Sequence, residues 1–354
     1  MVVSGGLLVS GQVLYARYAG AVNQQSLFGN KPPGAAPRKV NIKGPLNILL
    51  VGIDPRDANT APLSDSIIVA HIPAGLKEAY LFSIPRDLLV EIPPFAKTGF
   101  NGGTAKINSA MSYGSSVGNG KHDVAQGFEL LAKTVGRLTG IQEFDAGAII
   151  NFGGFKKIVE AMGGVTMTID QDIKSEHLQP DGKPRPRYPS CANNQCAHPY
   201  YGPQAQYPKG THHLEAWQAL DVVRQRYGLK RGDYDRQINQ QKFIKAMAKQ
   251  ALSQKVVTNP AKLDGILRAA GESLIFDGQG HNVVDWGLAL RGVNSENMTL
   301  VRLPGHSVFS GTGKNRDYQG EALDPSAQEF FAAVRDDTIT TFMVNHPEFI
   351  NRNS

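Results

Sequence analysis

Three short apolar runs near the start of the chain constrain its fold more than any other feature. They are LNILLVGI at 46–53, SIIVAHI at 66–72 and EAYLFSI at 78–84. Each is typical of a buried strand, and the Pro-Ala-Gly sequence at 73–75 is typical of a turn. The runs therefore predict a hairpin over 66–84 and three strands that begin one sheet.

The remainder of the chain alternates helical and strand patterns, which predicts an α/β fold. Phe128, Leu131, Val135 and Leu138, for example, recur at helical spacing on one stripe. The same patterns give helices at 127–138, 155–162, 214–223, 235–252, 260–273, 283–292 and 326–337, and strands at 165–170 and 298–303. A chain of 354 residues allows one large domain or two modest ones.

The N-terminus, VVSGGLLVSGQVLYARYAG, is apolar as far as Tyr15 and ends at Arg17. It is shorter than the roughly 20 residues of a membrane-spanning helix, and it lacks the basic region of a signal peptide. We interpret 1–17 as a partial membrane anchor and the Pro- and Gly-rich segment 18–45 as a stalk or linker; an ordinary surface helix is the alternative. This interpretation predicts a cell-membrane location through a single N-terminal anchor, with the rest of the chain extracytoplasmic.

Cys191 and Cys196 are the two cysteines of the sequence, and they lie in a Pro- and Tyr-rich insertion at 174–210. Such a pair in one short loop suits a small disulfide ring and an oxidising compartment. A metal site and two idle thiols are the alternatives. The spacing fits no zinc signature well, and such a site would draw on His177, His198, His212 or His213.

The net charge of +6 favours an anionic partner, either a nucleic acid, an anionic lipid or a phosphorylated substrate. No block of basic residues resembles a nucleic-acid-binding arm. Cations instead gather in DVVRQRYGLKRGDYDRQINQQ at 221–241, where two expected helices meet. They are Arg224, Arg226, Lys230, Arg231 and Arg236.

Polar residues mark corresponding ends of the three expected strands. Asp54 and Arg56 follow the first strand, Asp65 precedes the second, and Arg86 follows the third. If the second strand runs antiparallel to both neighbours, Asp54, Asp65 and Arg86 meet at one edge of the sheet. Arginine binds phosphate through a planar, permanently charged group that bonds bidentately.

Carboxylates beside these arginines make sense if a hard cation lies between them. Mg²⁺ takes one or two carboxylates, keeps several waters and bridges to phosphate oxygens. The sequence therefore predicts a metal-assisted diphosphate site composed of Asp54, Asp65, Arg86, Arg224, Arg226 and Arg236. Gln240, four residues after Arg236 on one helix, can face the same site.

Together the motifs resemble those of the LytR–CpsA–Psr (LCP) family of cell-wall phosphotransferases over roughly 46–252. In family order they are NILLVGIDPR, LSDSIIVAHI, SIPRD, KINSAMSYG, FGGFKKIVEAMGGV and ALDVVRQR with GDYDRQINQQ. The resemblance implies a three-layer αβα fold around a mixed β-sheet, with an apolar pocket for a polyprenyl chain. Residues 46–252 would form the catalytic domain, and the helices and strand of 253–354 would pack on it.

The resemblance also implies an enzyme that transfers a glycopolymer from a polyprenyl-diphosphate carrier to peptidoglycan, forming a phosphodiester. The glycopolymer would be a teichoic acid, an arabinogalactan or a capsule-like polysaccharide. Peptidoglycan and membrane lipid are the expected partners, and nucleic acid is not. By motif, Asp54 and Asp65 look like ligands of Mg²⁺ (or Mn²⁺), and the arginines look like a diphosphate clamp. Lys106 and Gln240 look like supporting contacts.

The sequence leaves two further roles to be assigned. Asp233 and Asp87 are both candidates for the base that accepts the proton of the acceptor hydroxyl, and Arg56 is a candidate substrate contact. Apolar residues such as Phe128, Leu131 and Val135 either line the lipid pocket or pack in an ordinary core.

Two positions depart from the family pattern. Leu63 and Asn239 stand where the family usually has arginine, which predicts a clamp that is weaker or shaped for another headgroup. Two alternative functions stay open: a polyprenyl-diphosphate hydrolase using the same site, and a non-enzymatic regulator of cell-wall genes. The regulator would need a cytoplasmic domain, and the cysteine pair argues against that.

Overall fold

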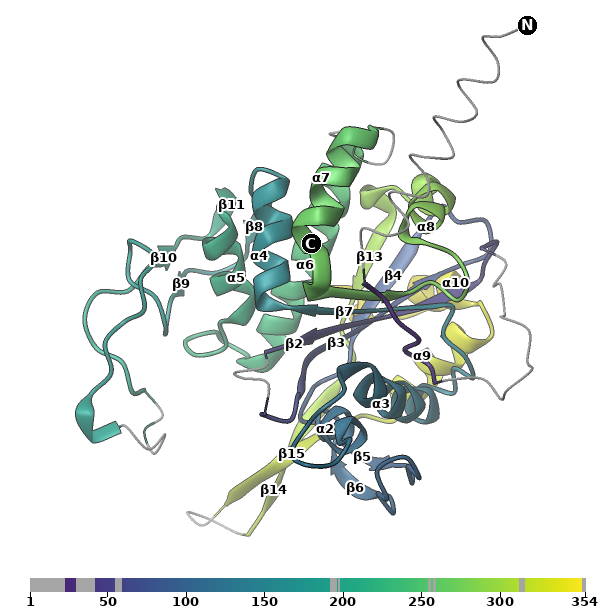
Figure 1. Ribbon diagram of the computed structural model, residues 1–354, viewed down its shortest axis with the longest axis horizontal. Helices are drawn as coiled ribbons and strands as arrows, with labels where there is room; N and C mark the ends of the chain where they lie inside the picture. The colour runs from purple at the N-terminus through teal and green to yellow at the C-terminus, as the bar shows by residue number, and fades with distance from the viewer. Residues whose placement is uncertain are drawn as a thin grey trace, which may run out of the picture.

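A seven-stranded mixed sheet forms the centre of the protein (Figure 1). The computed structural model describes residues 23–29, 42–54, 59–191, 196, 198–253, 256, 259–311 and 316–351. The strand order in the sheet is β1-β12-β7-β2-β3-β4-β13. The strands are β1 (Asn23–Gln24), β2 (Leu46–Ile53), β3 (Ser64–Ile72), β4 (Ala79–Ser83), β7 (Ala146–Asn151), β12 (Leu274–Asp277) and β13 (Met298–Val301).

The three strands expected from the apolar runs are neighbours in this sheet. β3 pairs antiparallel with both β2 and β4, with Leu50 opposite Ile68 and Val69 opposite Phe82. The Leu76 N–H donates to the Pro73 carbonyl at 3.2 Å and closes the turn between β3 and β4. The predicted hairpin and the predicted start of the sheet are therefore confirmed.

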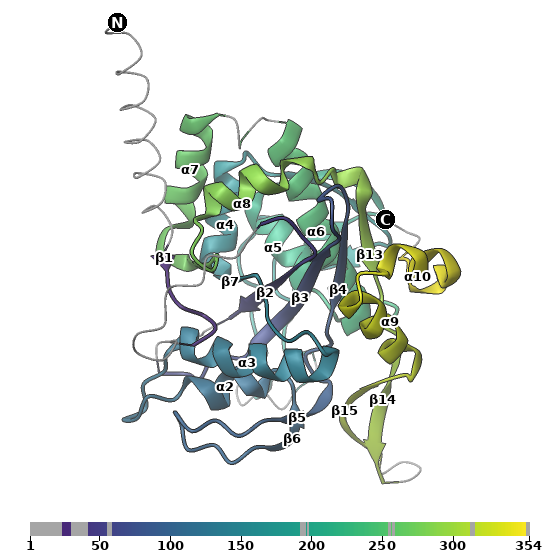
Figure 2. The same cartoon turned by 90° about the vertical axis from the view of Figure 1, so that its right-hand side faces the viewer.

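Helices cover both faces of the sheet (Figure 2), as the predicted αβα fold requires. They are α2 (Ser109–Ser115), α3 (Val124–Thr139), α4 (Phe152–Ala161), α5 (Ala216–Arg224), α6 (Asp233–Ser253), α7 (Pro260–Ala270), α8 (Val283–Ala289), α9 (Ser326–Arg335) and α10 (Ile339–Asn345). Every helix expected from the sequence is present, with ends that differ by at most three residues. The structure adds α2 and α10.

Alternate side chains of each strand enter different cores, as the two-residue period of a strand requires. Val69 and Phe82 pack toward α3 and α9, in the same cluster as Phe128 and Phe330. Ile68 and Leu81 point the other way and join a cluster with Trp286 of α8. The sheet is thus buried on both sides.

The two outer strands of the sheet, β1 and β13, have different surroundings. At one edge, β1 spans Asn23–Gln24 in the part of the chain that the structure describes. At the other edge, the segment after α10 runs beside β13: Ile350 forms an antiparallel bridge with Val301, and the Arg302 N–H donates to the Phe349 carbonyl at 2.9 Å. The last strand in the order is therefore covered by backbone.

Among the described residues, four further strand pairs lie outside the main sheet. They are β5 (Leu89–Ile92) with β6 (Gly103–Lys106), β8 (Val165–Ile169) with β11 (Gly210–Leu214), β9 (Ile173–Lys174) with β10 (Gln206–Tyr207), and β14 (Gly305–Ser310) with β15 (Asp317–Leu323). β14 and β15 project from the body as a long arm (Figures 1 and 2).

The insertion at 174–210 is held by internal bonds. Cys191 and Cys196 form a disulfide with a Cα–Cα distance of 5.5 Å. Arg185 is buried and donates to the Glu176 carbonyl at 2.8 Å and the Gly202 carbonyl at 3.2 Å.

The alternative metal site does not form around these cysteines. His212 bonds to the Pro208 carbonyl and His213 to Thr166. Among the residues that the structure describes, no three or more His, Cys, Asp and Glu side chains come together in a way that could hold a metal ion.

The predicted membrane location requires a correction. The proposed anchor at 1–17 and most of the stalk at 18–45 lie outside the described residues. In the part of the chain that is described, no helix combines the length and the apolar character needed to cross a bilayer. The prediction of a single N-terminal membrane anchor is therefore not supported by the described residues.

The stripe on α3 resolves as core packing. Phe128, Leu131 and Val135 have no exposed surface, and the Phe128 ring meets the Phe28 ring edge-on at 5.5 Å. Truncating a fully buried aromatic side chain removes its packing and leaves a cavity.

We therefore expect Phe128→Ala to lower the free energy of unfolding by about 3–5 kcal/mol, measured by urea denaturation. Phe309→Ala, at an exposed phenylalanine, is the matched control and should change it by less than about 0.5 kcal/mol. A Phe128→Ala protein of normal stability would contradict the core assignment and restore the lipid-pocket interpretation.

Candidate active site

The predicted site lies where the ends of β2, β3 and β4 meet, around Asp65 in β3. Gly52 pairs with Ser66 and Ile53 pairs with Ser64, so Asp65 is the extra residue of a β-bulge. A bulge re-aims its side chain and leaves the extra residue unpaired in the ladder. The Asp65 carboxylate forms an ion pair with Nη1 of Arg86, which follows β4.

Asp54 meets the end of α5 at the same edge. The Arg224 guanidinium lies 3.3 Å from Oδ2 of Asp54 and 4.2 Å from the ring centroid of Phe152, the first residue of α4. A cation over an aromatic face is stabilised by the ring quadrupole. Arg224 is thus held from two sides, and its side chain keeps a solvent-exposed portion.

Arg236 enters the site from the first turn of α6. Its Nη2 lies 2.7 Å from Oδ1 of Asp233 and donates to the Asp65 carbonyl oxygen at 3.2 Å. The side chain is almost fully buried, and its Nε has no hydrogen-bond acceptor. The predicted convergence of β3 and α6 therefore occurs, with Asp65 contacting both arginines.

The charges in this cluster are strongly coupled. Burial lowers the pKa of Arg236, and the nearby Arg86 and Arg226 lower it further. Asp233 and Asp65 act in the opposite direction without cancelling the effect. Because like charges close together disfavour one another, an anion bound here would relieve the repulsion.

Arg86 behaves differently from Arg236. Burial opposes its charge, but the carboxylates of Asp65, Asp87 and Asp233 outweigh that effect and raise its pKa. Its Nε is buried without a hydrogen-bond acceptor, and the Asp87 carboxylate lies 3.7 Å away. The site therefore contains unsatisfied guanidinium donors of the kind that a phosphate oxygen accepts from.

The two predicted supporting residues, Lys106 and Gln240, make different kinds of contact. Lys106, on β6, lies 3.5 Å from Asp87 and 4.9 Å from the Tyr318 ring centroid. Gln240 accepts from Ser66 Oγ at 2.9 Å and donates to the Val223 carbonyl at 3.2 Å. Both polar ends of Gln240 are thus used internally, and it joins α6 to β3 and α5.

Arg226 follows α5 and turns toward its neighbour. Its Nη2 donates to the Tyr227 hydroxyl at 3.0 Å, and its charge contributes to the lowered pKa of Arg236. Arg56, the remaining predicted contact, lies outside the described residues.

The two candidate bases have different surroundings. Asp233 contacts Arg236 and accepts from Gln237 Nε2 at 3.1 Å. Asp87 lies within 4 Å of Arg86 and Lys106. Both carboxylates are therefore within the arginine cluster.

The two departures from the family pattern lie apart from these contacts. Leu63, just before β3, is exposed. Asn239 is buried on α6 and lines a separate polar cavity with Gln171 and Arg302.

Sequence reasoning missed the contribution of the chain beyond residue 300. Glu321 on β15 accepts from Tyr234 at 3.1 Å and from Tyr318 at 2.8 Å, and its N–H donates to the Asp87 carbonyl at 2.8 Å. No local motif marked these residues, because they reach the site only through the pairing of β14 and β15. Phe152 is different, since it begins the quoted FGGFKK motif.

A magnesium ion fits the donor set at this edge. Asp54 and Asp65 supply two carboxylates on neighbouring strands, each now paired with an arginine. Mg²⁺ commonly binds through one or two carboxylates, with water and phosphate oxygens completing its shell. Two protein carboxylates without histidine or cysteine are compatible with that preference.

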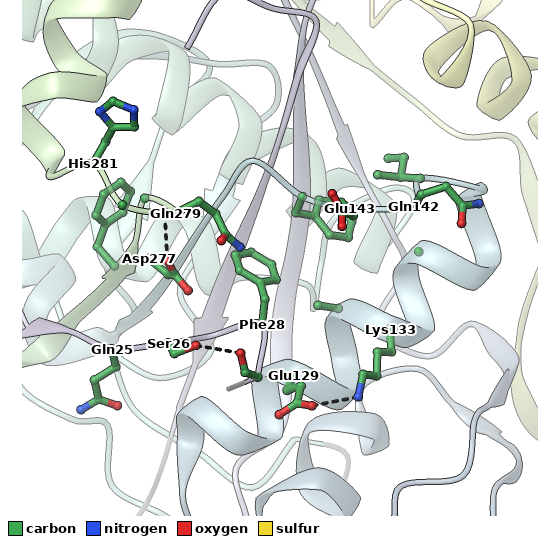
Figure 3. A pocket seen from close by; sticks show the side chains of 18 of the residues that line it. Gln25, Ser26, Phe28, Glu129, Lys133, Gln142, Glu143, Asp277, Gln279 and His281 are labelled. Atoms are coloured by element: carbon green, nitrogen blue, oxygen red, sulfur yellow. Dashed lines mark hydrogen bonds and ion pairs between the residues drawn. The ribbon is translucent and has the colours of Figure 1, made fainter. Parts of the chain in front are cut away.

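The cavity along α3 is a separate feature (Figure 3). It measures about 1120 Å³ and lies between residues 24–29, α3 and the segment 276–281. Its lining includes the Glu129–Lys133 ion pair at 2.8 Å. Phe144 at its border precedes β7, whereas Asp54 follows the parallel strand β2. The cavity thus lies near the opposite ends of the strands from the arginines, and its lining is partly charged.

The sheet, the bulged aspartate and the arginine cluster together define an LCP-type domain. The family model of LytR_cpsA_psr matches residues 14–333, and the chain belongs to this family. The cell wall biosynthesis protein LcpA of Corynebacterium glutamicum is 30% identical over 305 residues, which cover 79% of this chain and 53% of LcpA.

Two further relatives carry enzymatic names. A polyisoprenyl-teichoic acid–peptidoglycan teichoic acid transferase, TagU of Bacillus cereus, is 28% identical over 60% of this chain and 54% of its own length. TagV of Bacillus subtilis, named for the same activity, is 25% identical over 80% of this chain and 62% of its own length. The chain thus spans little more than half the length of these curated relatives.

Solved structures share the fold. The crystal structure of Bacillus subtilis TagV aligns with a TM-score of 0.58 and 23% identity, covering 84% of this chain and 98% of TagV. TagT bound to LI-WTA aligns with a TM-score of 0.57 and 21% identity, covering 87% of this chain and 99% of TagT. At these identities the likeness concerns the fold.

The internal bonds of Gln240 give an expectation for folding. Gln240→Leu should lower the free energy of unfolding by about 1–3 kcal/mol, because it leaves the Ser66 hydroxyl and the Val223 carbonyl without their partner. Gln142→Leu, at an exposed glutamine with one 3.3 Å bond, is the control for urea denaturation. Unchanged stability together with weaker diphosphate binding would instead make Gln240 a direct substrate contact.

Proposed function

We propose that the protein is a phosphotransferase that moves a glycopolymer from a polyprenyl-diphosphate carrier to peptidoglycan. The arginine cluster around Asp65 carries this proposal: Arg86 and Arg236 both contact Asp65, and both keep a buried donor without an acceptor. Family membership and the names of the relatives TagU and TagV support the same reaction class.

The arginines stabilise the negative charge that develops during transfer. In phosphoryl transfer, positioning and electrostatic stabilisation supply most of the catalysis. Arg224, held by Asp54 and Phe152, and Arg86, held by Asp65, are fixed before substrate arrives. Fixed donors cost little reorganisation when negative charge develops on the leaving polyprenyl phosphate.

The transfer forms one phosphorus–oxygen bond and breaks another. The oxygen of an acceptor sugar hydroxyl attacks the phosphorus bonded to the glycan, and the bond from that phosphorus to the polyprenyl phosphate breaks. A phosphodiester forms, and Asp233 or Asp87 accepts the hydroxyl proton. The departing phosphate retains the bonding electron pair, next to the guanidinium groups.

Asp54 and Asp65 are the residues that would hold Mg²⁺. When bound, the ion would supply a Lewis acid for diphosphate oxygens. The remaining work falls to the side chains: the arginines bind and orient the diphosphate, and Gln240 holds α6 against β3.

Loss of one clamp arginine should lower the rate of transfer while the protein stays folded. Arg86→Ala and Arg224→Ala should each lower transfer about 100-fold or more, the scale of one lost electrostatic stabiliser. The assay uses a synthetic polyprenyl-diphosphate glycan with peptidoglycan fragments as acceptor. Released polyprenyl phosphate without labelled peptidoglycan would identify a hydrolase instead.

Arg268→Ala is the matched control, because Arg268 is an exposed arginine on α7 paired with Asp264. It should transfer at the wild-type rate. Near wild-type turnover of Arg86→Ala or Arg224→Ala would remove that residue from the clamp.

The metal assignment has its own test. Asp54→Asn and Asp65→Asn should weaken Mg²⁺ binding measured by calorimetry and should lower turnover about 100-fold or more. A chelator should have the same effect on the wild-type enzyme. Asp181→Asn, at an exposed aspartate of the insertion, should change neither quantity. Full activity in excess chelator would rule out a required metal.

A further inference from the structure

The β14–β15 arm carries an exposed aromatic pair. Phe309 is 42% exposed and Tyr318 is 38% exposed, and their ring centroids lie 5.8 Å apart. Neither ring belongs to the core clusters of the described residues. Large aromatic side chains that stay exposed as a contiguous pair commonly mark a binding surface.

This pair is continuous with the arginine cluster. Lys106 lies over the Tyr318 ring at 4.9 Å and 3.5 Å from Asp87. The base of the arm is fixed there too: a Cβ on Gly320 would lie 2.6 Å from the Asp87 carbonyl oxygen. The aromatic pair therefore lies beside the proposed diphosphate site, on an arm whose strands β14 and β15 project from the body (Figure 1).

Hydrogen bonds fix the orientation of the Tyr318 ring. Its hydroxyl donates to Oε1 of Glu321 at 2.8 Å, and Ser307 donates to the same oxygen at 3.0 Å. Tyr234, on α6, donates to the other oxygen. A ring held in this way presents a rigid surface, so little side-chain entropy is lost when a ligand stacks on it.

We propose that Phe309 and Tyr318 form a sugar-binding subsite of the transferase, a proposal that rests on the function proposed above. The apolar face of a pyranose ring can pack on an exposed aromatic ring, which offers a large and flat apolar surface. Sugar hydroxyls need donors and acceptors around that ring. Arg316, whose guanidinium lies over the Phe309 ring at 4.1 Å from its centroid, provides donors beside that ring.

The chemistry of the arm favours sugar over a lipid surface. Residues 305–323 of the arm read GHSVFSGTGKNRDYQGEAL, in which the aliphatic residues are Val308, Ala322 and Leu323 and the stretch 310–317 has no apolar side chain. A segment that enters a bilayer interface needs a substantial apolar face. Aromatic rings among amides, hydroxyls and charges instead match a ligand that is apolar on its ring faces and polar at its rim.

The experiment compares matched pairs of probes by calorimetry. Farnesyl diphosphate with and without a linked N-acetylglucosamine tests a sugar on the donor. Glycan strands of N-acetylglucosamine and N-acetylmuramic acid, against buffer, test a sugar on the acceptor. We expect the wild-type protein to prefer one sugar-bearing probe, and Phe309→Leu to reduce that preference about fivefold. The probe affected identifies which sugar occupies the subsite.

Two further variants make the result specific. Phe309→Tyr keeps a planar ring and should retain the preference. Tyr113→Leu is the control, because Tyr113 is 40% exposed and stacks on Phe100 at 4.6 Å in another aromatic pair. Equal affinity of the wild-type protein for sugar-bearing and sugar-free probes, or an unchanged preference in Phe309→Leu, overturns the subsite.

Failure of the subsite is distinguishable from failure of the transferase proposal. Arg86→Ala should weaken binding of farnesyl diphosphate with or without the sugar, whereas Phe309→Leu should affect only the sugar-dependent part. Normal farnesyl diphosphate binding by Arg86→Ala would contradict the clamp. An intact clamp with no effect of Phe309→Leu would contradict the aromatic subsite alone.

Discussion

The bulge at Asp65 is the constraint on which the arrangement of the site depends. An extra residue in β3 is unpaired in the ladder, so its carbonyl accepts from Arg236 while its carboxylate binds Arg86. A buried guanidinium is costly unless it is paired and hydrogen-bonded. Because Arg236 is almost fully buried, the position of α6 is coupled to one irregularity in the sheet.

Local patterns were sufficient to predict the centre of the fold and most of the candidate cluster. Strand residues 46–53 form one continuous apolar run, and Asp65 and Arg86 stand immediately beside such runs. Once the middle strand is antiparallel to its neighbours, their meeting follows from geometry alone. Arg224 and Arg236 were recognisable because they lie close together in sequence, at the junction of two amphipathic helices.

Contacts that depend on distant pairing escaped prediction. β7 reads AGAIIN, too short and too rich in small residues to stand out. Glu321 reaches Asp87 only because β15 runs beside the segment that leads into β5, and nothing near residue 321 signals that neighbour. The α3 stripe shows the opposite limit: periodicity identified a buried face at Phe128 but could not say whether protein or lipid covers it.

The covering of β13 by residues 349–351 has a consequence for the behaviour of the protein in concentrated solution. An uncovered edge strand presents unpaired N–H and carbonyl groups to the same edge of another copy, which is a common route to aggregation. Here residues 349–351 occupy backbone groups of residues 300–302. This edge of the sheet is thereby protected from adding a strand of another copy, while the polar ends of the strands stay open to a ligand.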